Sequence, residues 1–244
     1  MEFKIHKIKW DNEKIKRFRD YLSSKKDESY FSKVLGGEII DLVNKHVKIK
    51  GLVLDYGCGP GFLIKFLLDK GYHCTGIDFS KGSVDITNGL FINNKGYILS
   101  IVVDNLPIES LSDNRFGCVF LLEAIEHFLS DQTSTTIKEI YRLLVPGGYI
   151  VVTTQNNEDI MSHEMMCPDC GCVFHRMQHM NSFDVSSLSK IMNSNGFERE
   201  YCKALNFREG SLESKFKNLY ENLMSLVKKP SVVKKNLIYI GRKK

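Results

Sequence analysis

From residue 52 onward, short apolar runs alternate with longer segments whose apolar residues recur every three or four positions. The short runs have the length of buried strands, and the longer period is that of amphipathic helices. We predict strands at residues 52–56, 73–78, 97–103, 117–122 and 149–154, with helices between them at about 60–70, 82–93 and 136–144. This alternation predicts an α/β fold: a parallel sheet with right-handed crossovers and helices on both faces.

The two ends of the chain depart from this alternation. Residues 11–24 and about 30–47 carry helical apolar patterns before the first strand. We therefore expect an N-terminal helical cap at residues 1–50 and the main domain at residues 51–244. Within the main domain we expect a polar insertion rich in cysteine and histidine at 155–182, a helix at 184–195, and two late strands, 197–207 and 236–241, that flank a helix at 212–227.

The composition is ordinary for a globular protein, with 43% hydrophobic and 26% charged residues. No apolar run approaches the ~20 residues of a membrane span, and the N-terminal residues lack the apolar core of a secretory signal. Seven cysteines, an odd number, fit a reducing compartment better than a disulfide framework, so we expect a cytoplasmic protein. Much of the net charge of +5 lies near the C-terminus, which favours a solvated tail over a nucleic-acid groove.

A glycine-rich turn follows the first strand of the alternation. The strand ends in Asp55, and three glycines come next at alternate positions, Gly57, Gly59 and Gly61. A strand, a glycine turn and a helix open a nucleotide-binding unit, because glycine lets the backbone approach a ligand and the helix N-terminus offers free N–H groups. Phe62 stands where a dinucleotide fingerprint has its third glycine, and the turn has no lysine or arginine for a phosphate. Asp78, at the end of the second strand, suits ribose hydroxyls, so the pattern favours a nucleoside without a phosphate chain.

These motifs resemble those of the class I S-adenosylmethionine-dependent methyltransferases. Val-Leu-Asp-Tyr-Gly-Cys-Gly-Pro-Gly is similar to motif I of that family, and Gly-Ile-Asp-Phe-Ser and Leu-Val-Pro-Gly-Gly match later motifs in the right order. The resemblance is strong over residues 50–155 and looser over the two late strands. It implies a Rossmann-like, seven-stranded, mostly parallel sheet with a reversed last strand, and S-adenosylmethionine as the cofactor.

The resemblance also implies where the cofactor lies. The glycines would follow its methionine moiety, Asp55 would lie near its ammonium group, and Asp78 would bind its ribose. The residue beside the adenine is an acid or amide before Leu-Pro, which leaves Asp104 and Asn105 as alternatives. The complete set implied for the cofactor is Asp55, Gly57, Gly59, Gly61, Asp78, Phe79, Asp104, Asn105 and Leu122.

A cluster of two acids and a histidine follows the fourth strand. Glu123, Glu126 and His127 would share one face of a helical turn. Three interpretations are open. The cluster only positions the acceptor; or His127 or Glu126 removes the acceptor's proton, since histidine titrates near neutrality; or the three groups and a later histidine bind a divalent ion. In the last case the motif resembles small-RNA 2'-O-methyltransferases.

The insertion carries a pattern of metal ligands. Cys167, Cys170, His175 and His179 have the spacing C-x2-C-x4-H-x3-H, which can close a tetrahedral, structural zinc site. Cys172 is a spare thiol. The alternative is a reduced, metal-free loop, but a loop with little apolar content favours a metal staple. His179 has a second option, because it could point back to the acids after the fourth strand, and it cannot easily serve both sites.

We therefore expect an S-adenosylmethionine-dependent methyltransferase that acts on a hydroxyl of a small-molecule acceptor, such as a sugar or a natural-product intermediate. One alternative is a metal-dependent RNA 2'-O-methyltransferase, which the few basic residues near the presumed cleft argue against. The other is a non-catalytic, zinc-stapled interaction module, which the intact glycine turn argues against. The sequence leaves the methylated atom and the oligomeric state open.

Overall fold

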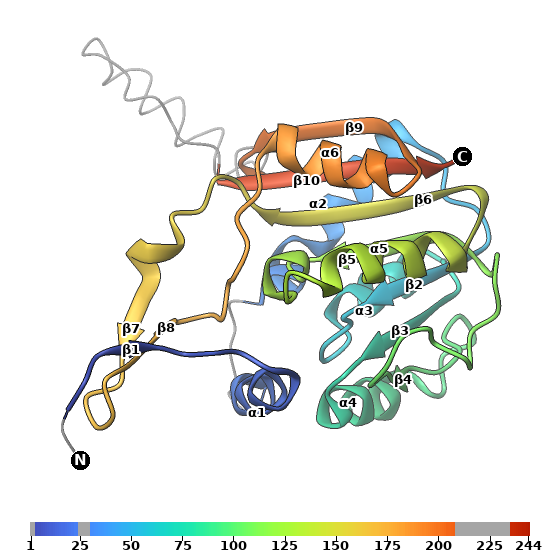
Figure 1. Ribbon diagram of the computed structural model, residues 1–244. Helices are drawn as coiled ribbons and strands as arrows, with labels where there is room; N and C mark the ends of the chain where they lie inside the picture. Colours follow the sequence, from blue (N-terminus) through green and yellow to red (C-terminus); the bar gives the residue numbers. More distant parts are fainter. Residues whose placement is uncertain (1–2, 24–29, 208–234) are drawn as a thin grey trace, which may run out of the picture.

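The computed structural model describes residues 3–23, 30–207 and 235–244. Its centre is a seven-stranded sheet with the strand order β4-β3-β2-β5-β6-β10-β9 (Figure 1). The strands are β2 (Leu52–Tyr56), β3 (Cys74–Asp78), β4 (Ile101–Val102), β5 (Phe116–Leu122), β6 (Leu144–Gln155), β9 (Phe197–Leu205) and β10 (Asn236–Lys243). The strands from β4 to β6 pair in parallel, and β10 runs antiparallel to β6 and β9. The predicted Rossmann-like sheet with one reversed strand is confirmed.

Helices cover both faces of this sheet (Figure 1). The helices are α2 (Phe31–His46), α3 (Phe62–Asp69), α4 (Lys81–Phe91), α5 (Gln132–Leu143) and α6 (Val185–Ser194). Successive residues of β5 point to opposite faces: Val119 and Leu121 pack with α5 and α6, whereas Cys118 and Phe120 pack with α2 and α3. Because both faces are buried, the central strands are continuously hydrophobic.

Two predicted strands differ from the structure by more than two residues at one end. The strand expected at residues 97–103 is reduced to β4, because Asn88 of α4 bonds both the backbone N–H and the carbonyl of Ser100 and so takes groups that would extend the ladder. The strand expected at 149–154 begins earlier, since β6 includes the Pro-Gly-Gly turn. The helix expected at 212–227 lies outside the described residues.

The N-terminal segment and the insertion form a second, smaller sheet beside the main one (Figure 1). In it β8 (Cys172–His175) lies between β1 (His6–Lys7) and β7 (Glu164–Met166). Phe174 of β8 makes two edge-to-face ring contacts with the N-terminal segment. Its ring centroid lies 6.5 Å from that of Trp10 and 6.2 Å from that of Phe18, which is on α1 (Asn12–Ser23). The expected cap is thus divided, because α2 packs on the main sheet and α1 packs against the insertion.

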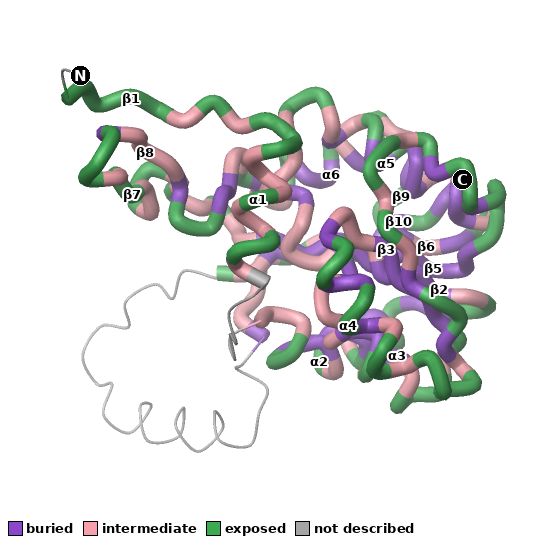
Figure 2. Tube along the Cα trace, turned by 90° about the horizontal axis from the view of Figure 1, so that it is seen from below, coloured by how far each residue is buried: buried purple, intermediate pink, exposed green. Residues whose placement is uncertain are grey.

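Burial differs between the two sheets. The strands at the centre of the main sheet are buried, whereas β1, β7 and β8 are largely exposed or half-buried (Figure 2). None of the described helices has the length and apolar character needed to span a membrane. The core of the protein is therefore the main sheet with its helices.

Candidate active site

A cavity of about 1780 Å³ opens at the carboxyl ends of β2, β3 and β5. Ligands of open α/β sheets bind at this edge, where the strand order reverses, here between β2 and β5. Among the residues predicted to hold the cofactor, those that line the cavity are Gly57, Gly59, Asp78, Phe79, Asp104, Asn105 and Leu122. Asp55 and Gly61 are not part of this lining. The residues expected to follow the fourth strand, Glu123, Glu126 and His127, line the same cavity.

The glycine turn has left-handed backbone conformations, with φ values of 83° at Gly57, 49° at Gly59 and 82° at Gly61. Glycine adopts this region without steric cost. A Cβ on Gly59 would meet no atom within 4 Å, so the turn is open on the cavity side. A Cβ on Gly61 would lie 2.8 Å from Phe91 and 2.9 Å from Thr87. Gly59 therefore leaves room for a ligand, whereas Gly61 allows α3 to approach α4.

Asp78 joins the glycine turn to the end of β3. Its Oδ2 accepts a hydrogen bond of 2.9 Å from the N–H of Gly59, and its Oδ1 accepts one of 2.8 Å from the N–H of Ser80. A carboxylate has about four acceptor positions, so each oxygen keeps one for a ligand hydroxyl. Burial raises the pKa of Asp78, and the two backbone hydrogen bonds oppose that shift. The two backbone hydrogen bonds therefore fix the orientation of this carboxylate at the cavity.

Asp55 lies near the end of β2, just before the turn, and is 3% exposed. Burial, together with the nearby negative charge of Asp78, raises the pKa of Asp55 to about 8. Its carboxyl group is therefore neutral at pH 7. The resemblance implies a place near the cofactor's ammonium group, and Asp55 itself is buried and is not part of the cavity lining.

The pKa of Asp55 predicts a pH-dependent stability. The unfolded chain loses this proton near pH 3.8 and the folded chain keeps it to about pH 8. The folded state thus binds the extra proton between these values, and its stability falls as the pH rises, by at most ~1.4 kcal/mol per pH unit from this group. Asp55→Asn has no proton to lose, so urea unfolding should show it gaining stability relative to wild type from pH 5 to pH 8. A constant difference over this range would contradict the assignment.

The cluster after β5 is built on a tight turn. Glu123 has a left-handed backbone, with φ of 47°, and η1 (Ile125–His127) is a short 3-10 helix, not the helical face that the spacing suggested. This turn buries Glu126 to 1% exposure. Burial raises the pKa of Glu126 to about 7 and that of Glu123 well above its usual range. The backbone N–H groups of Met180 and Asn181 donate to the carbonyl of Glu126, which ties the end of the insertion to the turn.

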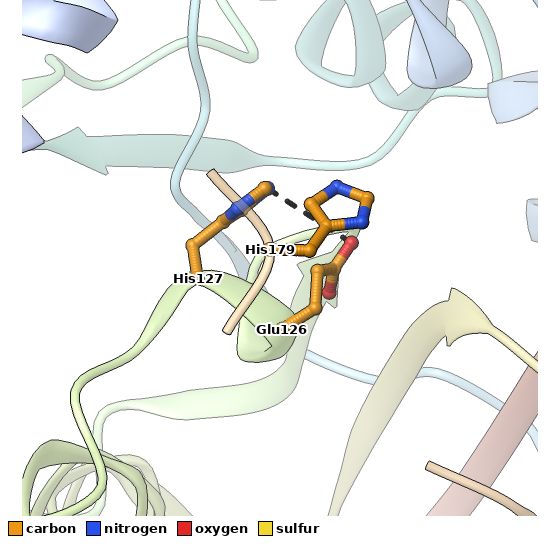
Figure 3. A group of neighbouring side chains, drawn as sticks. All are labelled: Glu126, His127 and His179. Carbon is orange, nitrogen blue, oxygen red and sulfur yellow. Dashed lines mark ion pairs between the residues drawn. The ribbon is translucent and has the colours of Figure 1, made fainter. Parts of the chain in front are cut away.

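His179 from the insertion completes this cluster. The imidazole rings of His127 and His179 lie 4.7 Å apart between centroids, and His127 Nε2 is 3.9 Å from Glu126 Oε1 (Figure 3). Nδ1 of His127 is 3.3 Å from the carbonyl oxygen of Gln178, and Nδ1 of His179 is 2.5 Å from Oε2 of Glu158. Burial lowers the pKa of both histidines, that of His179 to about 4. Both rings are therefore neutral at pH 7.

The four residues expected to bind zinc are not brought together within the described part of the chain. Cys167 and Cys170 are in the turn that joins β7 to β8, whereas His175 pairs with Glu164 at the opposite end of that hairpin. A strand rises ~3.3 Å per residue, so the hairpin itself separates thiols from imidazoles. The expected zinc site required these four residues to lie in one compact loop. Instead His175 Nε2 and His179 Nδ1 face Glu158, and backbone hydrogen bonds from the turn lower the pKa of the Cys167 thiol.

Arg19 of α1 is a site residue that the sequence analysis missed. Its guanidinium donates to the carbonyl of Met177, at 3.4 Å, and to the side chain of Gln178, at 3.3 Å. It lines the cavity, and its positive charge acts on both Asp78 and Glu126. One signal was available, because an arginine on the apolar face of an amphipathic helix needs a partner in the interior.

A family model described as methyltransferase domain matches residues 9–201. The chain belongs to this family. This confirms the resemblance to class I S-adenosylmethionine-dependent methyltransferases. Among curated relatives, the ubiquinone biosynthesis O-methyltransferase of Alkalilimnicola ehrlichii is 29% identical over 107 residues, which cover 43% of this chain and 41% of the relative. The chain spans about half the length, or less, of the relatives of this kind that it matches.

Solved structures share the fold of the methyltransferase-family chain. The PH0226 protein of Pyrococcus horikoshii has a TM-score of 0.64 at 18% identity, over 92% of this chain and 99% of that one. The 1,6-didemethyltoxoflavin-N1-methyltransferase of Burkholderia thailandensis, with bound 1,6-didemethyltoxoflavin and S-adenosylhomocysteine, has a TM-score of 0.63 at 14% identity, over 93% and 87% of the two chains.

Proposed function

We propose that this methyltransferase-family chain transfers a methyl group from S-adenosylmethionine to a hydroxyl group of a small molecule. The observation that carries the proposal is one cavity with two chemically different ends. One end has an open glycine turn and the oriented carboxylate of Asp78. The other has Glu123, Glu126 and His127 after β5, together with His179 of the insertion.

The donor end fits a nucleoside that has no phosphate chain and carries a sulfonium group. Asp78 keeps acceptor positions for ribose hydroxyls, and Gly59 leaves open space for the methionine moiety. Asp104 and Asn105 both line the cavity for the adenine, and Asp104 also contacts Lys16 of α1 at 3.4 Å. The Burkholderia thailandensis neighbour binds S-adenosylhomocysteine, the product of this cofactor, in a chain of the same fold.

The acceptor end has what a hydroxyl group requires. Methyl transfer needs an in-line approach of the nucleophile, exclusion of water, and removal of the hydroxyl proton. Glu126 or His127, which both line the cavity, would take up that proton, and the two oxygens of Glu126 are buried without a hydrogen bond in the described part of the chain. α1 contributes Arg19 and neighbouring side chains to the lining of the cavity. The volume of about 1780 Å³ exceeds the ~300–1,000 Å³ of a site for one drug-sized ligand, which leaves room for cofactor and acceptor together.

A screen tests the proposal. We expect titration calorimetry to show one S-adenosylhomocysteine bound per chain, and mass spectrometry to show a gain of one methyl group on hydroxyl-bearing acceptors from a panel of phenols, sugars and nucleotide sugars. The relatives named ubiquinone biosynthesis O-methyltransferase make phenols the first choice. Failure to bind S-adenosylhomocysteine would contradict the proposal, and so would transfer only to nitrogen acceptors or to RNA.

A further inference from the structure

Three side chains from distant parts of the sequence converge at the acceptor end of the cavity. One ligand atom from each of Glu126, His127 and His179 lies within 4.8 Å of the others, and Figure 3 shows the two rings and the carboxylate turned toward one another. Ligand atoms ~2.0–2.2 Å from one ion are separated by no more than about twice that distance. The three groups are therefore close enough to hold one ion after small side-chain adjustments.

The carboxylate of Glu126 has His127 Nε2 at 3.9 Å but no hydrogen-bond donor among the residues that the structure describes. Both of its oxygens are buried and neither makes a hydrogen bond within residues 3–23, 30–207 and 235–244. Oε1 of the neighbouring Glu123 is also buried and makes no hydrogen bond to these residues. An unsatisfied buried polar group costs about 1–3 kcal/mol, and native structures contain few of them. A cation between the carboxylate and the imidazoles would satisfy these oxygens.

The hydrogen bonds that His127 and His179 make through Nδ1 are of the kind found for histidines that bind a metal through Nε2. A carbonyl oxygen only accepts, so Nδ1 of His127 donates to Gln178 and its Nε2 carries a lone pair. Nδ1 of His179 donates in the same way to the carboxylate of Glu158. A histidine that binds a metal through one nitrogen commonly donates its other N–H to a carbonyl or carboxylate, which fixes the ring. Both rings are thus fixed by Nδ1 contacts and keep Nε2 for a ligand.

We propose that Glu126, His127 and His179 bind a divalent transition-metal ion. Two imidazoles and one carboxylate favour ions such as Mn²⁺, Fe²⁺ or Zn²⁺ over Mg²⁺, which prefers oxygen ligands. Three protein ligands leave positions open for an acceptor oxygen, and a metal lowers the pKa of a hydroxyl bound to it. This last role rests on the proposed methyl transfer, whereas binding of the ion does not.

Titration calorimetry with Mn²⁺ on the chelator-treated full chain tests the proposal. Mn²⁺ is the probe because the thiolates of Cys167 and Cys170 select softer ions. We expect one Mn²⁺ per chain in wild type, and binding weaker by about tenfold or more in Glu126→Gln and His179→Ala. The matched controls are Glu109→Gln and His73→Ala, two exposed positions, and they should bind as wild type does.

Three results of these titrations would overturn the proposed metal site. Absent binding in wild type, or unchanged binding in both Glu126→Gln and His179→Ala, would overturn the proposal. Loss in His175→Ala without loss in His127→Ala would also overturn it, because the ion would then belong to the group formed by Glu158, His175 and His179. Binding of S-adenosylhomocysteine by the same variants shows that they are folded. A chain that binds Mn²⁺ but not S-adenosylhomocysteine would keep the metal site and refute the proposed methyl transfer.

Discussion

Replacing Asp78 with alanine is expected to weaken the binding of S-adenosylhomocysteine by at least about 100-fold. A hydrogen bond to a charged group contributes ~1.5–3 kcal/mol, so losing two to the ribose costs at least ~3 kcal/mol, and each ~1.4 kcal/mol is tenfold in the dissociation constant. The variant also removes the acceptors of the Gly59 and Ser80 N–H groups, which loosens the glycine turn. Titration calorimetry measures the change.

The matched control for this prediction is Asp85→Ala. Asp85 is an exposed acid on α4 whose partner, Lys81, lies 2.6 Å away one helical turn earlier. Exposed pairs of this kind contribute ~0.3–0.5 kcal/mol, so the control should bind S-adenosylhomocysteine like wild type. If Asp78→Ala also bound within a few-fold of wild type, the ribose assignment and the location of the cofactor would both be refuted.

Replacing Gly61 with alanine is expected to lower the free energy of unfolding by ~2–4 kcal/mol. Its φ of 82° costs a residue with a Cβ ~1 kcal/mol, and the new carbon would lie 2.8 Å from the ring of Phe91 and 2.9 Å from Thr87. Forcing a methyl group into a packed contact adds ~1–3 kcal/mol. Urea unfolding followed by circular dichroism measures the loss.

Gly59→Ala is the variant to compare with Gly61→Ala, because Gly59 also has a left-handed backbone but no atom close to where a Cβ would lie. Its φ is 49° and its Cβ would meet no atom within 4 Å. We expect a loss of stability of only ~1 kcal/mol, combined with weaker binding of S-adenosylhomocysteine since the new methyl group enters the ligand's space. Equal losses of stability in Gly59→Ala and Gly61→Ala would contradict the division of roles between the two glycines.

The local pattern was sufficient for the sheet and the glycine turn. Strand β2 has the bounds that the apolar run predicts, and the strand, glycine turn and helix are contiguous in sequence. Such elements form from neighbouring residues, so their period and turn residues report them directly. The carboxyl ends of parallel strands meet at one edge, which is why the distant Asp78 could be joined to the turn before the structure was known.

The acceptor end depended on contacts that the sequence does not encode locally. The spacing of Cys167, Cys170, His175 and His179 suited one zinc site, but the β7–β8 hairpin separates the thiols from the imidazoles. Packing brings His179 to the acids after β5, since the N–H groups of the residues after it bond to the carbonyl of Glu126, and it also lies beside Glu158 and His175. Arg19 entered the site only because α1 packs against the insertion through aromatic side chains.

The sequence by itself therefore determined the family, through motifs that resemble it, and the alternating strands and glycine turn, because these rest on periodicity and on residues joined by short turns. Only the tertiary structure decided the acceptor end. Glu126, His127 and His179 meet because an insertion folds back across the end of β5 and is tied there by backbone hydrogen bonds. The side chains that these bonds bring together are separated by some 50 residues of sequence, over which no local period or spacing applies.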